Sequence, residues 1–270
     1  MTCRTAVALG LGLALLGACA HPPPATVPAL LDRVLPTPVL MLGEQHDAPE
    51  HQVLQREVVQ ALAARGQLGA LVMEMAEQGR QTRGLPADAS EDQVRAALNW
   101  TDAGGWPWPV YGPVVMAAVR GGAPVIGGNL PRAQMRGAMG NAALDGLIGE
   151  PALARQREGI REGHCGLLPE SQIAPMTRIQ LARDQAMAQT TAQAVRDAGP
   201  GKTVVLVAGN GHVRRDLGVP LYLPKDLGHR VVMAQAGGAK DGATPADSVW
   251  LTPPQPPRDH CAELRQQFKR

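Results

Sequence analysis

Short apolar runs recur along the chain, and each ends at a glycine or a polar residue. Five runs have the length and composition of buried strands and cover residues 39–42, 68–75, 123–127, 203–208 and 230–235. Segments with helical patterning lie between or before them, over 49–65, 91–98, 110–120 and about 171–197. Buried strands that alternate with helices are typical of a mainly parallel sheet with helices on both faces. The pattern therefore predicts an α/β fold over residues 37–253.

Two segments do not follow this alternation of strand and helix. Residues 79–105 combine a polar turn with a modest helix, and residues 144–170 are polar, interrupted by glycine and without a strand. We expect both to form a smaller helical subdomain inserted into the α/β domain. Residues 254–270 are expected to form a C-terminal tail.

The N-terminus has the pattern of a secretory signal. Arg4 precedes an apolar run over residues 6–16, which is too short to span a membrane stably. Leu16-Gly17-Ala18-Cys19 resembles the bacterial lipobox, which predicts a signal peptide over 1–18 and a lipidated Cys19. By resemblance to the sorting of Gram-negative lipoproteins, Ala20 in place of Asp favours the outer membrane, with the domain expected to face the periplasm. An ordinary secretory signal is the alternative. Residues 19–36 are expected to be a lipidated cysteine and a proline-rich spacer.

Composition excludes some partners and points to one local cluster. The formal net charge is only +2, so neither nucleic acid nor a strongly acidic partner is indicated. Only seven residues are Trp, Tyr or Phe, yet Trp106, Trp108 and Tyr111 fall within six positions. Of the four cysteines, Cys165 and Cys261 remain for an oxidising compartment, which predicts a disulfide between them; two free thiols are the alternative.

Polar side chains follow the apolar runs at the points where the predicted strands end. Glu44 and His46 follow the first run, Glu74 ends the second, and Asn129 follows the third. Asn210 and His212 follow the fourth. Ligands bind at the carboxyl edge of open parallel sheets, so we expect these side chains to converge there.

Two glycine-containing segments, Gly43-Glu44-Gln45-His46 and Gly209-Asn210-Gly211-His212, deliver the two imidazoles. We expect glycine to provide sharp turns there. Two His and one or two Glu side chains bind a divalent metal or form a general base with an orienting partner. Their spacing alone does not distinguish these chemistries.

The same segments carry a family resemblance. The two glycine-containing segments, Val72-Met73-Glu74-Met75 and Gly128-Asn129-Leu130-Pro131-Arg132 occur in an order similar to that of ChaN-type lipoproteins. The stretches over 106–113 and 164–169 add to the match, which covers about residues 39–223. That family shares a superfamily with the Tiki proteases and the erythromycin esterases.

The resemblance implies an outer-membrane lipoprotein that binds haem for iron uptake or relay. It also implies a homodimer that holds two haems face to face, and a haem receptor as a further partner. It implies a tyrosinate iron ligand, for which Tyr111 is preferred over Tyr222 because it lies beside Trp106 and Trp108, which are expected to stack on the porphyrin. Further cofactor-binding candidates are His164 beside the iron ligand and, for the propionates, Arg132, Arg136, Arg214 and Arg215.

The superfamily also suggests an alternative, a periplasmic metal-dependent hydrolase of peptide or ester bonds. Glu44, His46, Glu74 and His212 are its candidate catalytic residues, with Glu44, His46 and His212 as ligands of a divalent metal.

Overall fold

A computed structural model describes residues 23–102, 105–238 and 245–267, so the predicted signal peptide and Cys19 lie outside the described residues. A six-stranded sheet forms the centre, in the order β3-β2-β4-β1-β5-β6. Its strands are β1 (Val39–Glu44), β2 (Leu68–Glu77), β3 (Val125–Asn129), β4 (Thr203–Gly209), β5 (His229–Ala236) and β6 (Ser248–Thr252). Every pair of neighbouring strands is parallel, which confirms the predicted fold class.

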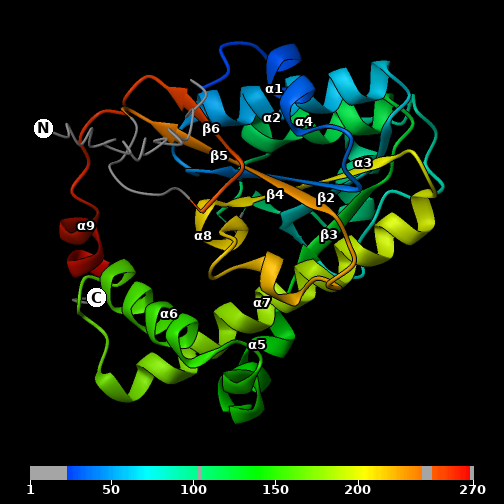
Figure 1. The fold of residues 1–270 in the computed structure, drawn as a ribbon. Coiled ribbons are helices and arrows are strands. Elements are labelled where there is room, and N and C mark those ends of the chain that lie inside the picture. The colour runs from blue at the N-terminus through cyan, green and yellow to red at the C-terminus, as the bar shows by residue number, and fades with distance from the viewer. Residues whose placement is uncertain (1–22, 103–104, 239–244, 268–270) are drawn as a thin grey trace, which may run out of the picture.

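Helices cover both faces of the sheet (Figure 1). One face carries α1 (Val27–Val34), α2 (Pro49–Ala64), α3 (Glu91–Leu98) and α4 (Trp108–Arg120), and the other carries α7 (Glu170–Ala198), α8 (Asn210–Val213) and η3 (Val219–Tyr222). Because side chains alternate along a strand, Leu40 and Leu42 pack into the core under the first face, whereas Val39 and Met41 pack into the core under the second. Both faces of the sheet are therefore buried.

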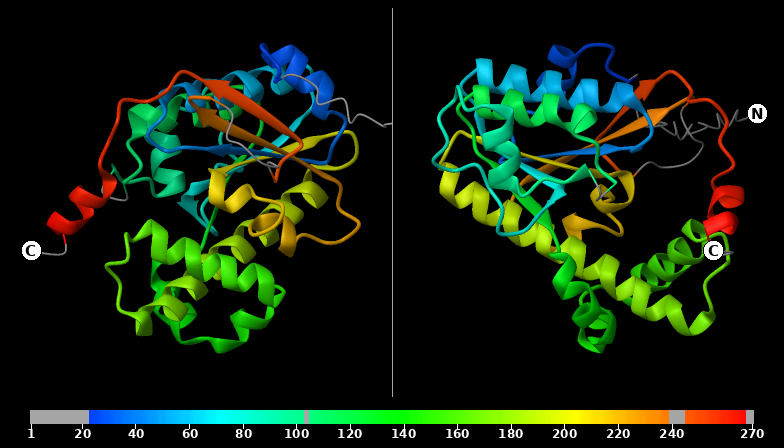
Figure 2. Two further views of the ribbon diagram at one scale, coloured as in Figure 1. Left: turned by 60° about the vertical axis from the view of Figure 1, so that its left-hand side comes forward. Right: turned by 180° about the vertical axis from the view of Figure 1, so that it is seen from behind.

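A small helical subdomain packs against the helices of the second face. It consists of α5 (Arg132–Gly140), η2 (Ala142–Gly146) and α6 (Glu150–Gly163), packed on α7 (Figures 1 and 2). A separate apolar cluster, including Leu144, Leu153 and Leu181, holds it together. The expectation that residues 79–105 belong to this subdomain is wrong, because Val94 and Leu98 of α3 lie in the core of the α/β domain. Only the segment after β3 forms the subdomain.

Both ends of the domain contain elements that the sequence analysis missed. The expected spacer contains α1, whose Val27, Leu30, Leu31 and Val34 are buried at the i, i+3, i+4, i+7 spacing of an amphipathic helix. The sheet also gains β6, an edge strand whose buried positions are Ser248 and Thr252, so that its apolar pattern is weak. The tail contains α9 (His260–Gln267). Within the described ranges, no helix is long and apolar enough to cross a membrane.

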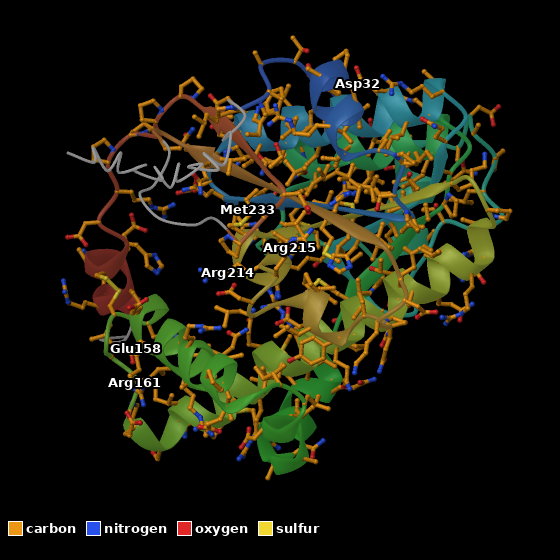
Figure 3. The ribbon with its side chains drawn as sticks, in the orientation of Figure 1. Asp32, Glu158, Arg161, Arg214, Arg215 and Met233 are labelled. Atoms are coloured by element: carbon orange, nitrogen blue, oxygen red, sulfur yellow. A yellow bond between two sulfur atoms is a disulfide. The ribbon has the colours of Figure 1, made fainter. Side chains whose placement is uncertain are left out.

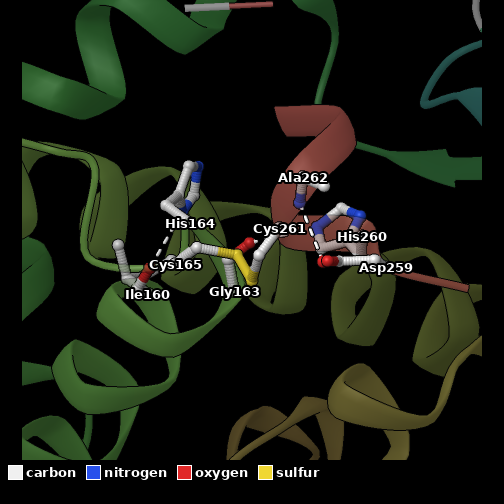
Figure 4. The surroundings of a disulfide bond; sticks show 8 residues. All are labelled: Ile160, Gly163, His164, Cys165, Asp259, His260, Cys261 and Ala262. Carbon is white, nitrogen blue, oxygen red and sulfur yellow. Dashed lines mark hydrogen bonds between the residues drawn. A yellow bond between two sulfur atoms is a disulfide. The ribbon is translucent and has the colours of Figure 1, made fainter. Parts of the chain in front are cut away.

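A disulfide joins Cys165 and Cys261, the pair expected from the sequence. It connects the loop between α6 and α7 to α9, with a Cα–Cα distance of 5.7 Å (Figure 4). The tail runs from β6 at the edge of the sheet down to the helical subdomain (Figure 2). The bond therefore ties the end of the chain to the subdomain.

We predict that replacing both cysteines by serine lowers the free energy of unfolding by about 2–4 kcal/mol, because the bond closes a long loop in the unfolded chain. The bond spans a sequence separation of 96 residues. Urea unfolding of residues 20–270 measures the difference, with the reduced wild type as the matched control. Titration of two free thiols in the denatured, unreduced wild type would contradict the account.

Candidate functional site at the carboxyl ends of the strands

The sheet has its topological switch point between β1 and β4. These strands are neighbours, but the chain leaves β1 through α2 on one face and leaves β4 through α8 on the other. Connections that diverge to opposite faces open a crevice at the carboxyl ends of the two strands. Glu44 and His46 lie at the end of β1, and His212 lies in α8. The predicted convergence of the strand-end residues is therefore present.

A buried Glu44 carboxylate is the centre of the first group. The Glu44 residue is 2% exposed, and side chains from three directions donate to it. Tyr111 Oη donates to Oε1 at 2.7 Å and Gln52 Nε2 donates to Oε2 at 2.8 Å, while Gln55 Nε2 also donates to Oε2. His46 Nδ1 donates to Oε1 at 2.6 Å. Both carboxylate oxygens are therefore satisfied without water.

His46 is the accessible member of this group. Its side chain is 42% exposed, and its ring packs edge-on against Trp106 with 4.7 Å between the centroids. Burial opposes a charge on the ring, but the hydrogen bond to Glu44 and the negative charge of Glu74 outweigh it and raise the pKa of His46. The ring is thus fixed by a carboxylate at Nδ1 and reaches the surface of the site.

A second buried carboxylate, Glu74, organises the other half of the site. Its Oε2 accepts from the amide of Gly209 at 2.7 Å, and its Oε1 accepts from Arg183 Nη2 at 2.5 Å. His212 lies between Glu74 and Asp184, with Nε2 3.4 Å from Glu74 Oε1 and Nδ1 2.5 Å from Asp184 Oδ1. The three side chains and Arg183 form one buried ionic network.

The charges of this network favour one protonation state of Glu74 and of His212. Burial opposes ionisation of Glu74, but His212 and Arg183 outweigh it and keep the pKa of Glu74 well below its usual range. Burial also opposes a charge on His212, yet Glu74 and Asp184 raise the pKa of His212 to about 9. His212 is therefore an imidazolium at neutral pH, paired with the Glu74 carboxylate.

The glycines Gly43 and Gly209 do not make the sharp turns that the sequence analysis expected. Both are the last or next-to-last residues of buried strands. They are needed for close approach, because a Cβ on Gly43 would overlap Asn210 and Val213 of α8. A Cβ on Gly209 would lie 2.9 Å from His46 Nε2. The missing side chains let α8 and His46 pack against the sheet.

The site does not have the arrangement of a divalent metal centre. Across residues 23–102, 105–238 and 245–267, no group of three or more His, Cys, Asp or Glu side chains is placed to hold a metal ion. The expected ligand set of Glu44, His46 and His212 is split between two networks, and both nitrogens of His212 face carboxylates. The alternative of a metal-dependent hydrolase has no support in this geometry.

A cavity of about 430 Å³ lies beside these networks. It is bounded by the ends of β2 and β3, the segment before α4 and the start of α5. Its apolar lining includes Met75, Leu98, Trp100, Trp106, Leu130 and Met135, and its cations are Arg80, Arg132 and Arg183. Arg183 also reaches inward to Glu74 and to Asn129 Oδ1, the latter at 2.9 Å. Apolar surface next to several guanidinium groups fits a flat apolar ligand with carboxylate groups.

Tyr111 does not occupy the position expected of an iron ligand. It is 1% exposed and its hydroxyl donates to Glu44. Burial and the Glu44 charge raise the pKa of Tyr111 far above its usual range, which disfavours a phenolate. Tyr222 is half-buried between two apolar clusters. Burial, together with the smaller effect of the Asp184 charge, raises the pKa of Tyr222 as well. Neither tyrosine presents an ionised oxygen to the cavity.

The remaining candidates divide between the cavity and other places. Trp106 and Arg132 line the cavity, whereas Trp108 is buried and donates through Nε1 to Glu91 at 2.8 Å. His164 lies beside the disulfide and its Nδ1 donates to the carbonyl of Ile160 at 2.8 Å, away from the cavity (Figure 4).

Arg214 and Arg215 lie after α8, on the side of the sheet that faces the subdomain (Figure 3). Arg214 pairs with Asp216 at 2.8 Å, and Arg215 pairs with Asp247. Neither lines the cavity. Arg136 is exposed on α5, one turn beyond Arg132.

Sequence reasoning missed Arg80 and Arg183. Arg183 lies in the middle of α7, whose pattern gives no sign that it turns toward the strand ends. A signal existed for Arg80, since it follows the strand that carries Glu74.

Comparisons with known proteins agree with this fold. Residues 30–223 match the model of a family described as haem-binding uptake, Tiki superfamily, ChaN. ChaN of Campylobacter jejuni, with cofacially bound haem, is 21% identical at a TM-score of 0.60, over 76% of this chain and 84% of that one. The type III effector HopBA1 is 16% identical at a TM-score of 0.56, over 87% of this chain and 97% of that one. No curated protein matches the chain.

We predict that the ionic network makes stability depend on pH. The pKa of His212 rises from 6.5 to about 9 on folding, so its contribution is complete below pH 6.5 and is lost as the pH rises through about 9. His46, whose pKa is also raised, contributes in the same direction. Urea unfolding of the wild type should therefore give a free energy of unfolding that falls between pH 6.5 and 9. In the His212→Gln variant, the free energy of unfolding should be lower than that of the wild type at pH 6.5 and should fall less steeply between pH 6.5 and 9. An equally steep fall in this variant would contradict the role of His212 in the pH dependence.

Proposed function

Because the chain belongs to the haem-binding uptake family of the Tiki superfamily, the ChaN family, we propose that it binds haem as a cargo in the cavity beside Trp106. The observation that carries the proposal is the composition of the cavity wall. One part of the wall is aromatic and aliphatic, and Arg80, Arg132 and Arg183 stand beside it. A porphyrin presents a wide apolar face and two carboxylates, which require both kinds of surface.

The described residues fit the porphyrin in two respects. The rings of Trp100 and Trp106, with Met75 and Met135, offer polarisable apolar surface. Guanidinium groups bind carboxylates through paired hydrogen bonds, so Arg80 and Arg132 are suited to the two propionates. Arg183 is already committed to Glu74 and would add charge more than a direct bond.

We further propose that two copies bring their haems face to face; the solved structure of ChaN of Campylobacter jejuni is described as showing cofacial haem binding. The cavity supports this arrangement because part of its lining comes from exposed residues of α5, including Arg132. A haem bound against the main domain with one face uncovered could meet the haem of a second subunit at that face. Sedimentation of the protein with and without haemin measures the expected dimer.

The proposed location is the periplasmic side of the outer membrane, where a lipidated Cys19 anchors the domain and a haem receptor is a suitable partner. The support is the lipobox-like Leu16-Gly17-Ala18-Cys19 and the apolar run before it. Two or more acyl chains anchor a protein stably, whereas removal of the acylated residue releases it. In cell fractionation, the wild type should be found in the membrane fraction and the Cys19→Ala variant in the soluble fraction. Unchanged membrane association in this variant would remove the anchor from the proposal.

We predict that residues 20–270 bind haemin and that Arg132→Ala weakens this binding about tenfold, the loss expected for one charge-assisted hydrogen bond. Arg136→Ala is the matched control, because Arg136 is an exposed arginine of the same helix that does not line the cavity. The Soret band during a haemin titration reports the affinity of each protein.

The control variant should bind as tightly as the wild type. Equal losses in the two variants would show a general charge effect and place the propionates elsewhere. A wild type that produces no Soret change at stoichiometric haemin would contradict haem binding altogether.

A further inference from the structure

We propose that the cavity binds porphyrin dicarboxylates through their ring faces and carboxylate groups and contributes no ligand to the central metal. Metal-free protoporphyrin should then bind as tightly as haem. The inference rests on the proposed function, since it names the class of ligand that the proposed haem site accepts. Its basis is a disagreement within that site. The cavity wall fits the porphyrin ring but has no side chain of the usual kind for the iron.

The first observation is the set of side-chain types in the cavity wall. Proteins hold haem iron through His, Tyr or Cys, or through Met opposite a His. Among the described residues that line the cavity, none is a His, a Tyr or a Cys. Residues 102–105, which connect two lining residues, are Asp, Ala, Gly and Gly and add none of these types. The thioethers of Met75 and Met135 therefore have no histidine opposite them in the wall.

The second observation is that two oxygen acceptors of the wall are engaged with its arginines. Glu77 Oε1 accepts from the backbone amide of Arg132 at 3.0 Å. Asn129 Oδ1 accepts from Arg183 Nε at 2.9 Å. These hydrogen bonds hold the first residue of α5 and the middle of α7 beside the ends of β2 and β3. Both acceptors thus position the cations of the wall.

The third observation is that side chains of the ligating types lie near the cavity but outside its wall. The Tyr111 hydroxyl donates to Glu44, and the residue is 1% exposed. His46 Nδ1 also donates to Glu44, and its Nε2 faces the end of β4, where a Cβ on Gly209 would lie 2.9 Å away. Both nitrogens of His212 face carboxylates. Each side chain would have to leave these contacts to reach a metal in the cavity.

The cations of the wall, by contrast, are available to a ligand. Arg80 follows β2 and Arg132 begins α5, and both residues are exposed at the cavity. Within the described ranges neither guanidinium group takes part in an ion pair, whereas that of Arg183 is paired with Glu74. A guanidinium group binds a carboxylate through two parallel hydrogen bonds. The wall therefore recognises carboxylates and an apolar ring, and both belong to the porphyrin and not to its metal.

Titrations of residues 20–270 with haemin, with metal-free protoporphyrin and with protoporphyrin dimethyl ester test the inference. Porphyrin absorbance and quenching of tryptophan fluorescence report each dissociation constant. Haemin and metal-free protoporphyrin should give dissociation constants that agree within about fivefold, and a larger loss for the metal-free ligand would overturn the inference. The dimethyl ester keeps the ring but has no carboxylate, so it should bind at least about tenfold more weakly than the diacid.

Variants of the nearby ligating residues add a readout that a folding defect does not move. In His46→Ala and in Tyr111→Phe, the ratio of the dissociation constants of haemin and metal-free protoporphyrin should equal the wild-type ratio. A structural defect weakens both ligands alike and leaves this ratio unchanged. A variant that weakens the binding of haemin alone would identify its side chain as an iron ligand and overturn the inference.

Arg80→Ala tests the recognition of the carboxylates. This variant should bind metal-free protoporphyrin about tenfold more weakly and the dimethyl ester as the wild type does, because the ester has no charge for Arg80 to pair with. Arg136→Ala is the matched control, since Arg136 is exposed on α5 and does not line the cavity, and it should change neither affinity. Equal losses for the diacid and the ester in Arg80→Ala would contradict the proposed pairing.

The outcomes separate this inference from the proposed function. Haemin binding without binding of metal-free protoporphyrin overturns the inference and leaves haem binding intact. A wild type that responds to none of the three porphyrins overturns both proposals together.

Discussion

The site depends on the burial of one carboxylate, that of Glu44. A buried charge is costly unless every lone pair is satisfied, and here donors from α2, from α4 and from the segment after β1 provide the hydrogen bonds. Gln52 and Gln55 lie one turn apart on α2 and meet the same oxygen, while Tyr111 and His46 share the other. One interaction therefore fixes the packing of two helices on the sheet and the orientation of the exposed imidazole.

A second buried carboxylate, Glu74, joins elements in the other half of the molecule. It connects the end of β2 to the backbone of Gly209 and, through Arg183, to the long helix α7 that carries the helical subdomain. The same arginine lines the cavity. Arg183 thus links the buried ionic network to the surface that we propose for haem.

Much of the fold and half of the site follow from the sequence. Strand-end placement predicted that Glu44, His46, Glu74 and His212 converge, because parallel strands bring their carboxyl ends to one edge. Their partners on helices were not predictable, since the apolar pattern of α7 does not show that a polar residue such as Arg183 turns inward. The hydrogen bond from Tyr111 to Glu44 was not predictable for a related reason. An aromatic cluster indicates packing surface, but whether its hydroxyl faces a ligand or a buried carboxylate is decided by tertiary contacts.

A crystal structure of the haem complex is the most direct test of the proposal that haem lies in the cavity beside Trp106. Anomalous scattering at the iron edge locates the metal independently of the protein atoms. The proposed site predicts iron within the cavity, with the propionates toward Arg80 and Arg132. Iron located outside the cavity would contradict this placement of the haem.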